Sequence, residues 1–328
     1  MVIIVGAGPI GLATAIELKR QEIPAKIIER GCLVNSIYHY PKDMTFFSTS
    51  ERLEIGDVPF ISHNPKPTRR EALEYYRRAA ESYELDIHLY EGVEDISGAN
   101  GHFLVRTDKD TYEASKVVVS TGFYDIAKMM NIPGEELEKV KHYYDEAHAY
   151  AWQDVLVIGG GNSAVDAALE TYRSHANVTL AVRDSQIKES VKYWVKPDIR
   201  NRIKNGEIDG YFNTEVVEIT PKTVVLNTPD GIKTISNDFV LAMTGYQPNF
   251  ELMNKFGIEL TNDEKQMPVY DEQTLETNRK GIYVAGVVCG GMDTSSLFIE
   301  NTRIHAEHIA NDIKNKLSPA NAAVKQHA

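Results

Sequence analysis

Cysteine is nearly absent from this chain of 328 residues, which contains only Cys32 and Cys289. The two cysteines form neither a C-x-x-C pair nor any spacing typical of metal ligands. This absence excludes a redox-active disulfide between neighbouring cysteines, and it predicts no metal site. It indicates two reduced thiols in a protein of the cytoplasm, where disulfides are rare.

Basic residues and long apolar runs are also scarce. The chain has 35 Lys and Arg residues against 47 Asp and Glu residues, so its formal net charge is −12. This balance argues against a nucleic-acid-binding protein, although it is compatible with a local basic pocket for a phosphorylated cofactor. No stretch approaches the roughly 20 continuous apolar residues that a membrane helix needs. We therefore expect neither nucleic acid nor membrane among the partners.

A glycine-rich motif opens the chain. The β-branched run of residues 2–5 is followed by Gly6, Gly8 and Gly11 in G-x-G-x-x-G spacing, then by a helical pattern and a strand that ends at Glu29. The order is that of a dinucleotide-binding β-α-β unit, in which the glycines allow a tight turn, approach of the pyrophosphate and close helix packing. The helix N-terminus would donate to phosphate, and Glu29 would accept from ribose hydroxyls. The alternative is an ordinary α/β turn.

A second motif of the same kind lies in "DVLVIGGGNSAVDAALETY", residues 154–172. Gly159 and Gly161 take the first two glycine positions, and Ala164 takes the third. The strand after this helix ends in Arg183, with Lys188 five residues further on, rather than in an acid. A basic residue here suits a 2′-phosphate, so the second site is predicted to prefer NADPH to NADH. The alternative is that Arg183 is a solvated surface charge.

Two further apolar strands, in residues 116–125 and 238–249, end in Thr-Gly and would lead the chain between two nucleotide domains. The sequence therefore predicts an α/β fold of two Rossmann-like three-layer dinucleotide-binding domains, with the second inserted into the first. We expect the first domain in residues 1–122 and 246–328 and the second in 123–245. A disordered tail is expected from about residue 317.

The motifs that fill this layout resemble those of a known group. "SIYHYPKDMTFFSTSERLEIGDVPF", "HYYDEAH", "GGGNSAVDAALE", "VKYWVKPDIRNRIKNGEI", "AGVV" and "FIENTRIHA" are similar to the bacillithiol disulfide reductase (YpdA-type) family, within the low-molecular-weight thioredoxin-reductase-like flavoproteins. The resemblance extends from residue 2 to about residue 312. It implies FAD in the split domain, NADPH in the inserted domain, a role in redox homeostasis, and a cytoplasmic homo-oligomer, either a dimer or a tetramer.

The motifs and the resemblance together give the expected cofactor contacts. For FAD these are Gly6, Gly8, Pro9, Ile10, Gly11, Glu29, Arg30, Tyr40, Phe47, Ser48, Val93, Thr121, Gly122, Gly286, Val287, Phe298 and Ile299. For NADPH they are Gly159, Gly161, Asn162, Ser163, Ala164, Arg183, Lys188, Thr244 and Gly245. A helix after the strand "GIYVAG" would place its N-terminus at the flavin pyrimidine, where negative charge develops on reduction.

The route of the electrons beyond the flavin is open. His142 and Asp145 fall where thioredoxin reductases carry two redox cysteines, and absence of that pair is typical of the bacillithiol group. Ile10 stands where well-known members have a cysteine proposed to engage the disulfide, and isoleucine cannot form a mixed disulfide. Either that cysteine is dispensable, or the acceptor differs, or another thiol substitutes.

No catalytic residue can be assigned, but three candidates remain. His142 or His148 would deliver a proton to a leaving thiolate, and Cys289 is the candidate thiol near the predicted flavin edge. The alternatives are that the histidines pack the linker and that Cys289 is a buried bystander.

The leading hypothesis is an NADPH-dependent FAD flavoprotein that reduces a low-molecular-weight disulfide, bacillithiol disulfide. The first alternative is a ferredoxin or flavodoxin NADP⁺ reductase of the same architecture, which also lacks C-x-x-C and sends single electrons to a small carrier protein. The second alternative is a redox sensor that binds FAD and NADPH without turnover.

Overall fold

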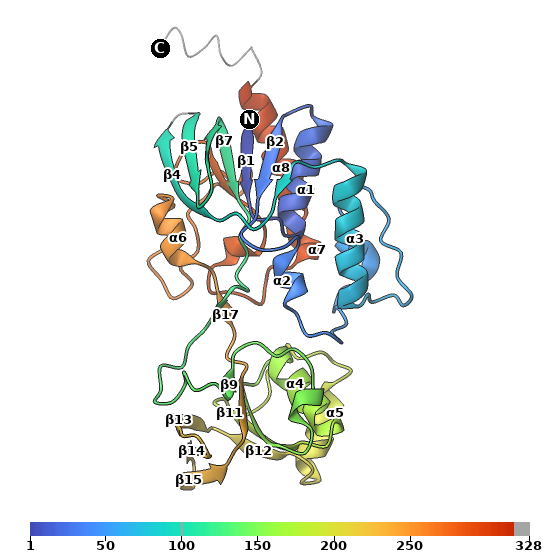
Figure 1. Cartoon of the computed structure of the whole chain (residues 1–328), viewed down its shortest axis with the longest axis vertical. Coiled ribbons are helices and arrows are strands. Elements are labelled where there is room, and N and C mark those ends of the chain that lie inside the picture. Colours follow the sequence, from blue (N-terminus) through green and yellow to red (C-terminus); the bar gives the residue numbers. More distant parts are fainter. Residues whose placement is uncertain (100, 318–328) are drawn as a thin grey trace. The chain divides into compact units, whose positions relative to one another are not determined.

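The computed structural model describes residues 1–99 and 101–317, and it divides into two compact units (Figure 1). The first unit comprises Met1–Tyr38, Met44–Ile126 and the chain from Tyr246 onward, and the second comprises His39–Asp43 and Ala127–Gly245. The boundaries expected after residues 122 and 245 lie, in this division, after residues 126 and 245. The tail expected to be disordered lies, apart from its first residue, outside the described residues.

The first unit is built on a parallel sheet of five strands in the order β18-β7-β1-β2-β3. The central strand is fully buried, as its β-branched residues predict. Val5 pairs with Ile28, so Gly6 and Glu29 leave the sheet at the same edge. The strands are β1 (Val2–Val5), β2 (Ala25–Ile28), β3 (Ile87–His88), β7 (Lys116–Val119) and β18 (Ile282–Val284).

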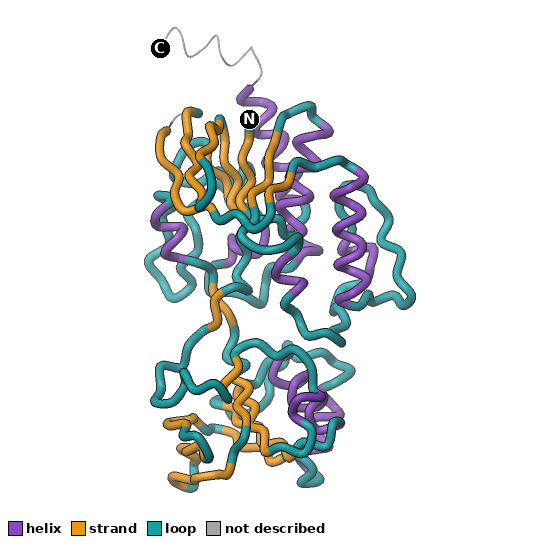
Figure 2. Tube along the Cα trace, in the orientation of Figure 1, coloured by secondary structure: helices purple, strands orange, loops and turns teal. Residues whose placement is uncertain are grey.

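Two further layers cover this sheet, and Figure 2 shows their helices and strands. Helices α1 (Pro9–Arg20) and α8 (Ile304–Leu317) pack against each other, and α1 also contacts α3 (Arg69–Ser82). An antiparallel sheet shares a buried apolar cluster with the parallel sheet; its strands are β4 (Val93–Ala99), β5 (His102–Thr107) and β6 (Thr111–Ala114). Shorter elements are α2 (Asn35–Tyr38), α6 (Phe250–Lys255), α7 (Ile299–Thr302) and the 3-10 helices η1 (Ser50–Leu53) and η3 (Gly286–Gly290).

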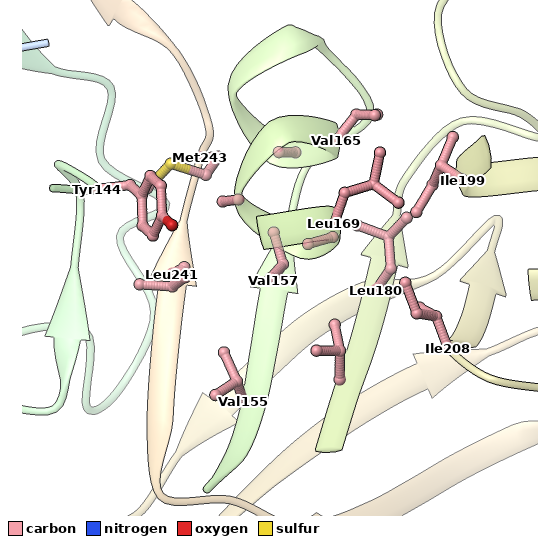
Figure 3. Packing of buried hydrophobic residues seen from close by; sticks show 14 of the residues in the cluster. Tyr144, Val155, Val157, Val165, Leu169, Leu180, Ile199, Ile208, Leu241 and Met243 are labelled. Carbon is pink, nitrogen blue, oxygen red and sulfur yellow. The ribbon is translucent and has the colours of Figure 1, made fainter. Parts of the chain in front are cut away.

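The second unit repeats this plan around a parallel sheet in the order β12-β11-β10-β16-β9. Its strands are β9 (Val140–Lys141), β10 (Asp154–Ile158), β11 (Asn177–Val182), β12 (Asp209–Phe212) and β16 (Phe239–Ala242). Val157 and Leu241 of the sheet belong to one core with Leu169 of α4 (Asn162–Arg173) and Ile199 of α5 (Lys196–Lys204) (Figure 3). The 3-10 helix η2 (His148–Tyr150) precedes β10.

An antiparallel sheet forms the third layer of this unit. Its strands are β13 (Glu215–Ile219), β14 (Thr223–Thr228) and β15 (Gly231–Ser236). Val224 and Leu226 of this sheet share a second apolar cluster with Leu156 and Val240 of the parallel sheet. The prediction of two three-layer Rossmann-like folds in one chain is therefore confirmed.

The chain passes from one unit to the other more often than the sequence suggests. Strands β8 (Ile126–Ala127) and β17 (Tyr246–Gln247) pair where the two expected crossings lie. In addition, His39–Asp43 belongs to the second unit, because the Lys42 backbone donates to Asp145 O at 2.9 Å and its ammonium pairs with Asp145 and Glu146. No helix in the described part of the chain is both long and apolar enough to cross a membrane.

Candidate nucleotide sites

The first glycine-rich loop is locked against its own helix. Gly6 has φ +108°, and a Cβ on Gly11 would lie 2.0 Å from Gly6 O, so only glycine fits at Gly11. A Cβ on Gly8, in contrast, would meet nothing within 4 Å. The loop thus combines tight packing at its first and third glycines with an open backbone at the second, as expected for approach of a pyrophosphate.

Glu29 closes this loop. Its Oε2 accepts from the Ala7 N–H and its Oε1 from the Gly31 N–H, both at 2.8 Å, and the residue is only 9 % exposed. Burial raises the pKa of Glu29, and the two N–H donors partly oppose that shift by stabilising the carboxylate. The acid at the end of β2 therefore shapes the loop and also remains at the surface of a pocket.

Several expected FAD contacts line that single pocket: Gly6, Glu29, Arg30, Val93, Thr121 and Gly122. The same lining includes Asp125, Gln247 and Asn249, which neither the glycine motifs nor the resemblance predict. Arg30 forms an ion pair of 2.7 Å with Asp125, which stands three residues after the Thr-Gly crossing. The acidic residue just beyond that crossing is the feature of the sequence that could have indicated Asp125.

The late glycine motif meets the first loop. A Cβ on Gly286 would lie 3.1 Å from Cγ1 of Ile10, which is 6 % exposed, and a Cβ on Gly122 would lie 3.9 Å from Cγ2 of Val287. Pro9 occupies the first turn of α1, where its missing N–H costs no hydrogen bond. Expected FAD residues from three distant segments therefore lie together in the first unit.

The other expected FAD residues are more scattered. Phe47 is 55 % exposed and its carbonyl accepts from the Lys66 ammonium at 2.7 Å, while Ser48 is half-buried. Phe298 stands at the N-cap position of α7 and Ile299 begins the helix, which packs against η3. Tyr40 lies in the second unit. The single helix expected after the late loop is two helices, α7 and α8.

The second glycine-rich loop has the same backbone design. Gly159 has φ +131°, and a Cβ there would lie 2.5 Å from Met243 O and 3.2 Å from Cβ of Ala164. Ala164 is fully buried, so a methyl group fits where the first loop requires glycine. A Cβ on Gly161 would again meet nothing within 4 Å.

An exposed basic segment lies beside this second loop. Arg183 and Lys188 are both exposed, and the Lys188 N–H donates to Gly160 O at 3.0 Å. The Asn162 side chain holds the segment in place, because its Oδ1 accepts from the Lys192 N–H at 2.8 Å and its Nδ2 donates to Ser190 O at 3.3 Å. The cofactor contact of Asn162 stays a prediction, whereas its contacts with this segment are not predictable from the glycine motif.

The remaining expected NADPH residues are Ser163, at the start of α4, and the second Thr-Gly pair. The Lys192 ammonium pairs with Asp166 at 2.7 Å, and Ser163 is exposed in the first turn of the helix. Thr244 donates its hydroxyl to Lys128 O at 2.7 Å, and the Gly245 carbonyl accepts from the Lys128 N–H. The second Thr-Gly pair therefore anchors the crossing segment.

The N-termini of α1 and α4 differ from that of an ordinary helix. Thr68 and Glu71 form a capping box on α3 and so satisfy its first N–H groups. Gly8 and Gly161 begin α1 and α4, and no side chain of the described residues caps either helix. The backbone borders open space at both glycines, and an uncapped helix N-terminus with its positive dipole end is an arrangement that binds phosphate.

The expected catalytic histidines differ in their surroundings. Nε2 of His142 lies 3.4 Å from the buried Glu135 carboxylate, whereas His148 is exposed in η2. Asp145 and Glu146 are occupied by ion pairs with Lys42, of 3.0 and 3.2 Å. Within residues 1–99 and 101–317, no group of three His, Cys, Asp or Glu side chains could hold a metal ion.

Both cysteines are free thiols, and neither is placed like a redox centre. Cys289 has no exposed surface, and burial raises its pKa to about 12. Cys32 is partly buried near Glu29, and burial raises the pKa of this thiol as well. Because thiolate is the reactive form, this environment argues against Cys289 as the substitute for the missing redox pair.

Two glycine-loop folds in one chain define a pyridine-nucleotide oxidoreductase. The chain belongs to the pyridine nucleotide-disulphide oxidoreductase family, whose model matches residues 3–286. This family assignment agrees with the two glycine-rich loops and with the α/β architecture.

Within that class the chain belongs to the Bdr (YpdA) group. It is 44% identical over 313 residues to bacilliredoxin reductase Bdr of Bacillus subtilis (strain 168), covering 95% of this chain and 96% of the relative. The solved bacillithiol disulfide reductase Bdr (YpdA) from Bacillus cereus matches with a TM-score of 0.94 and 44% identity, covering 96% of this chain and 99% of that one. The Staphylococcus aureus enzyme of the same name matches with a TM-score of 0.94 and 42% identity, covering 97% and 98%.

Proposed function

We propose that this oxidoreductase takes a hydride from NADPH, passes it to bound FAD and reduces a low-molecular-weight disulfide, bacillithiol disulfide. The overall reaction, NADPH + H⁺ + RSSR → NADP⁺ + 2 RSH, balances with two electrons. The observation that carries the proposal is the pair of uncapped, glycine-started helices with opposite charges beside them: Glu29 at the first loop, Arg183 and Lys188 at the second.

The first unit fits FAD by the chemistry of its residues. Gly8 leaves room for a pyrophosphate, and the α1 N-terminus supplies donors for it. Glu29 remains able to accept from ribose hydroxyls, because each carboxylate oxygen has a lone pair beyond the one used by Ala7 or Gly31. Bound FAD would supply the two-electron chemistry, and the protein's part is to hold and orient it.

The second unit fits NADPH. Gly161 and the α4 N-terminus form the corresponding phosphate cradle. Arg183 and Lys188 are exposed beside it, and cations in this position favour the 2′-phosphate over a free 2′-hydroxyl. Asn162 contributes by holding the basic segment to the helix.

The identity of the electron acceptor is inferred from the names of the relatives, since no side chain of the candidate sites indicates it. The solved relatives are named for bacillithiol disulfide and the B. subtilis relative for bacilliredoxin, a protein. We propose the small-molecule disulfide as the acceptor because both solved relatives are named for it. We further propose a cytoplasmic location, since the two reduced thiols suit a reducing compartment. The proposal of a homo-oligomer rests on the family resemblance alone.

The decisive experiment measures NADPH oxidation by the FAD-loaded full chain with separate acceptors. The acceptors are bacillithiol disulfide alone, the disulfide with a bacilliredoxin, a ferredoxin, a flavodoxin, and buffer. Fast oxidation that depends on the disulfide alone supports the proposal and shows that Ile10 is compatible with turnover.

The other outcomes would overturn parts of the proposal. Oxidation that needs bacilliredoxin makes the acceptor a protein disulfide, and oxidation with ferredoxin or flavodoxin only makes the chain a carrier reductase. FAD and NADPH binding without oxidation in any arm would make it a sensor.

A further inference from the structure

A histidine that the sequence analysis did not single out lies behind the late glycine motif. His305, in the first turn of α8, accepts at Nδ1 the hydrogen bond of the Gly286 N–H, with a length of 3.1 Å. Sγ of Cys289 lies 3.9 Å from the same nitrogen. One ring nitrogen therefore joins α8 to both ends of the η3 turn.

These contacts fix the protonation state of the ring. A backbone N–H can only donate, so Nδ1 must be unprotonated and the hydrogen of the neutral ring sits on Nε2. Burial, together with the nearby His308, lowers the pKa of His305 to about 4. Cys289 is protonated for the same reason of burial, so its S–H also suits an acceptor at Nδ1.

The turn held by His305 is packed from its other side as well. Gly286 has φ +84°, and a Cβ there would lie 3.1 Å from Cγ1 of Ile10. The next residue, Val287, reaches towards Gly122. The Gly286 peptide is thus fixed between the first turn of α1 and the ring on α8, and a rotation of this peptide would move Val287.

We propose that His305 is a positioning residue for FAD, which holds the Gly286 peptide and so sets the 286–290 turn against the flavin. The inference rests on the proposed function in one respect, namely that FAD binds in the first unit. His305 itself is not proposed to touch substrate or cofactor; it acts through Gly286.

Two substitutions of similar size test this role. The amide oxygen of Asn is as many bonds from Cα as Nδ1 of His, whereas the amide oxygen of Gln corresponds to Nε2. His305→Asn therefore keeps an acceptor for the Gly286 N–H, and His305→Gln misplaces it. His308→Gln, at an exposed position on the same helix, is the matched control.

The readouts are the FAD dissociation constant of the apoprotein, the visible spectrum of the bound flavin and the melting temperature of the apoprotein. We expect His305→Gln to weaken FAD binding about tenfold and to shift the flavin spectrum, as loss of a buried hydrogen bond predicts. His305→Asn and His308→Gln should stay within about threefold of the unmodified chain.

Three results would overturn the inference. Equal FAD dissociation constants and flavin spectra for His305→Asn and His305→Gln would show that the hydrogen bond to Gly286 does not position the flavin. Loss of FAD in proportion to loss of apoprotein melting temperature would reduce His305 to a core residue. Absence of FAD binding by the unmodified chain would contradict the proposed function itself, and is distinguished because it appears without any substitution.

Discussion

The two glycine-rich loops share one backbone and differ in what closes them. In both, the first glycine has positive φ and no room for a Cβ, while the second borders open space. In the first unit the closing group is a buried carboxylate, Glu29, bound by two backbone N–H groups. In the second unit the closing group is a neutral amide, Asn162, which holds an exposed segment. The exposed cations beside this loop are Arg183 and Lys188.

The difference is what the proposed function requires, namely one loop design for two cofactors. If both loops bind phosphate as proposed, the shared backbone geometry carries no preference between nucleotides. We expect the side chains around the backbone to set the preference. Salt should screen the buried carboxylate of Glu29 much less than the exposed cations of the second unit. We therefore expect the first unit to respond to packing and protonation, and the second to ionic strength.

The largest effect is expected from Gly11→Ala. Its Cβ would lie 2.0 Å from Gly6 O, so the first loop has to deform, and we expect complete loss of bound FAD. Ala164→Gly, at the corresponding position of the second loop, should lower the free energy of unfolding by only about 1 kcal/mol. The measurements are flavin absorbance per protein and urea unfolding. Ala164→Gly should retain FAD and therefore serves as the control, and retention of FAD by Gly11→Ala would contradict the comparison.

Acid should destabilise the first unit through His305. Its pKa in the folded protein is about 4, below the ordinary 6.5, so the unfolded chain takes up the proton first and stability is lost as the pH falls from 6.5 to about 4. The loss attributable to His305 is up to roughly 3 kcal/mol. The titratable groups that act on the His305 ring are His308 on the same helix and Cys289 on η3. The nearby carboxylate of Glu307, also on α8, interacts instead with Glu17 of α1.

The test compares urea unfolding of the unmodified chain and His305→Asn from pH 7 to pH 4. The shared titration of the carboxylates cancels in the difference between the two curves. Parallel curves would show that His305 titrates alike in the folded and unfolded chain.

A smaller effect is expected from removing the cations of the second unit. Arg183→Ala with Lys188→Ala should weaken binding of 2′,5′-ADP by about 10- to 100-fold and leave NADH binding unchanged, because only the 2′-phosphate contacts are lost. Binding by the unmodified chain should also weaken with added salt. Isothermal titration measures both, and Lys204→Ala, another exposed cation of this unit, is the control. Equal weakening towards NADH would remove the selectivity argument.

The smallest effect concerns the thiols, both of which lie in the first unit. Cys289 has no exposed surface and a pKa raised to about 12, so we expect no alkylation by iodoacetamide in the folded protein and full alkylation in urea. Peptide mass spectrometry measures each site. Rapid labelling of Cys289 in the folded chain would restore it as a candidate redox thiol.

Local patterns predicted those parts of the molecule that depend on neighbours in sequence. The strand before Gly6, the helix after it and the acid at Glu29 follow from β-branched residues, glycine spacing and helical periodicity, and all three lie where expected. Ala164 at the third position was also correctly placed, since it is buried against Gly159.

Features that depend on distant contacts could not be predicted in this way. Asn162 meets Lys192 thirty residues later, and His305 meets Gly286 across a loop and α7. A histidine in a helical pattern gives no sign of which backbone group it accepts from. His142 and His148 remain candidates on sequence grounds alone, and the roles of the cofactor contacts stay predictions until FAD and NADPH binding are measured.

The five residues His39–Asp43 have a practical meaning for anyone who wishes to express one half of the molecule. The chain changes unit after residues 38, 43, 126 and 245, so residues 127–245 are not the whole of the second unit. A shortened gene that encodes only that stretch would deprive Asp145 and Glu146 of their shared cation, Lys42. The same constraint applies to chimaeras of two relatives. If only residues 127–245 are exchanged, His39–Asp43 still comes from the other relative, although these five residues belong to the second unit.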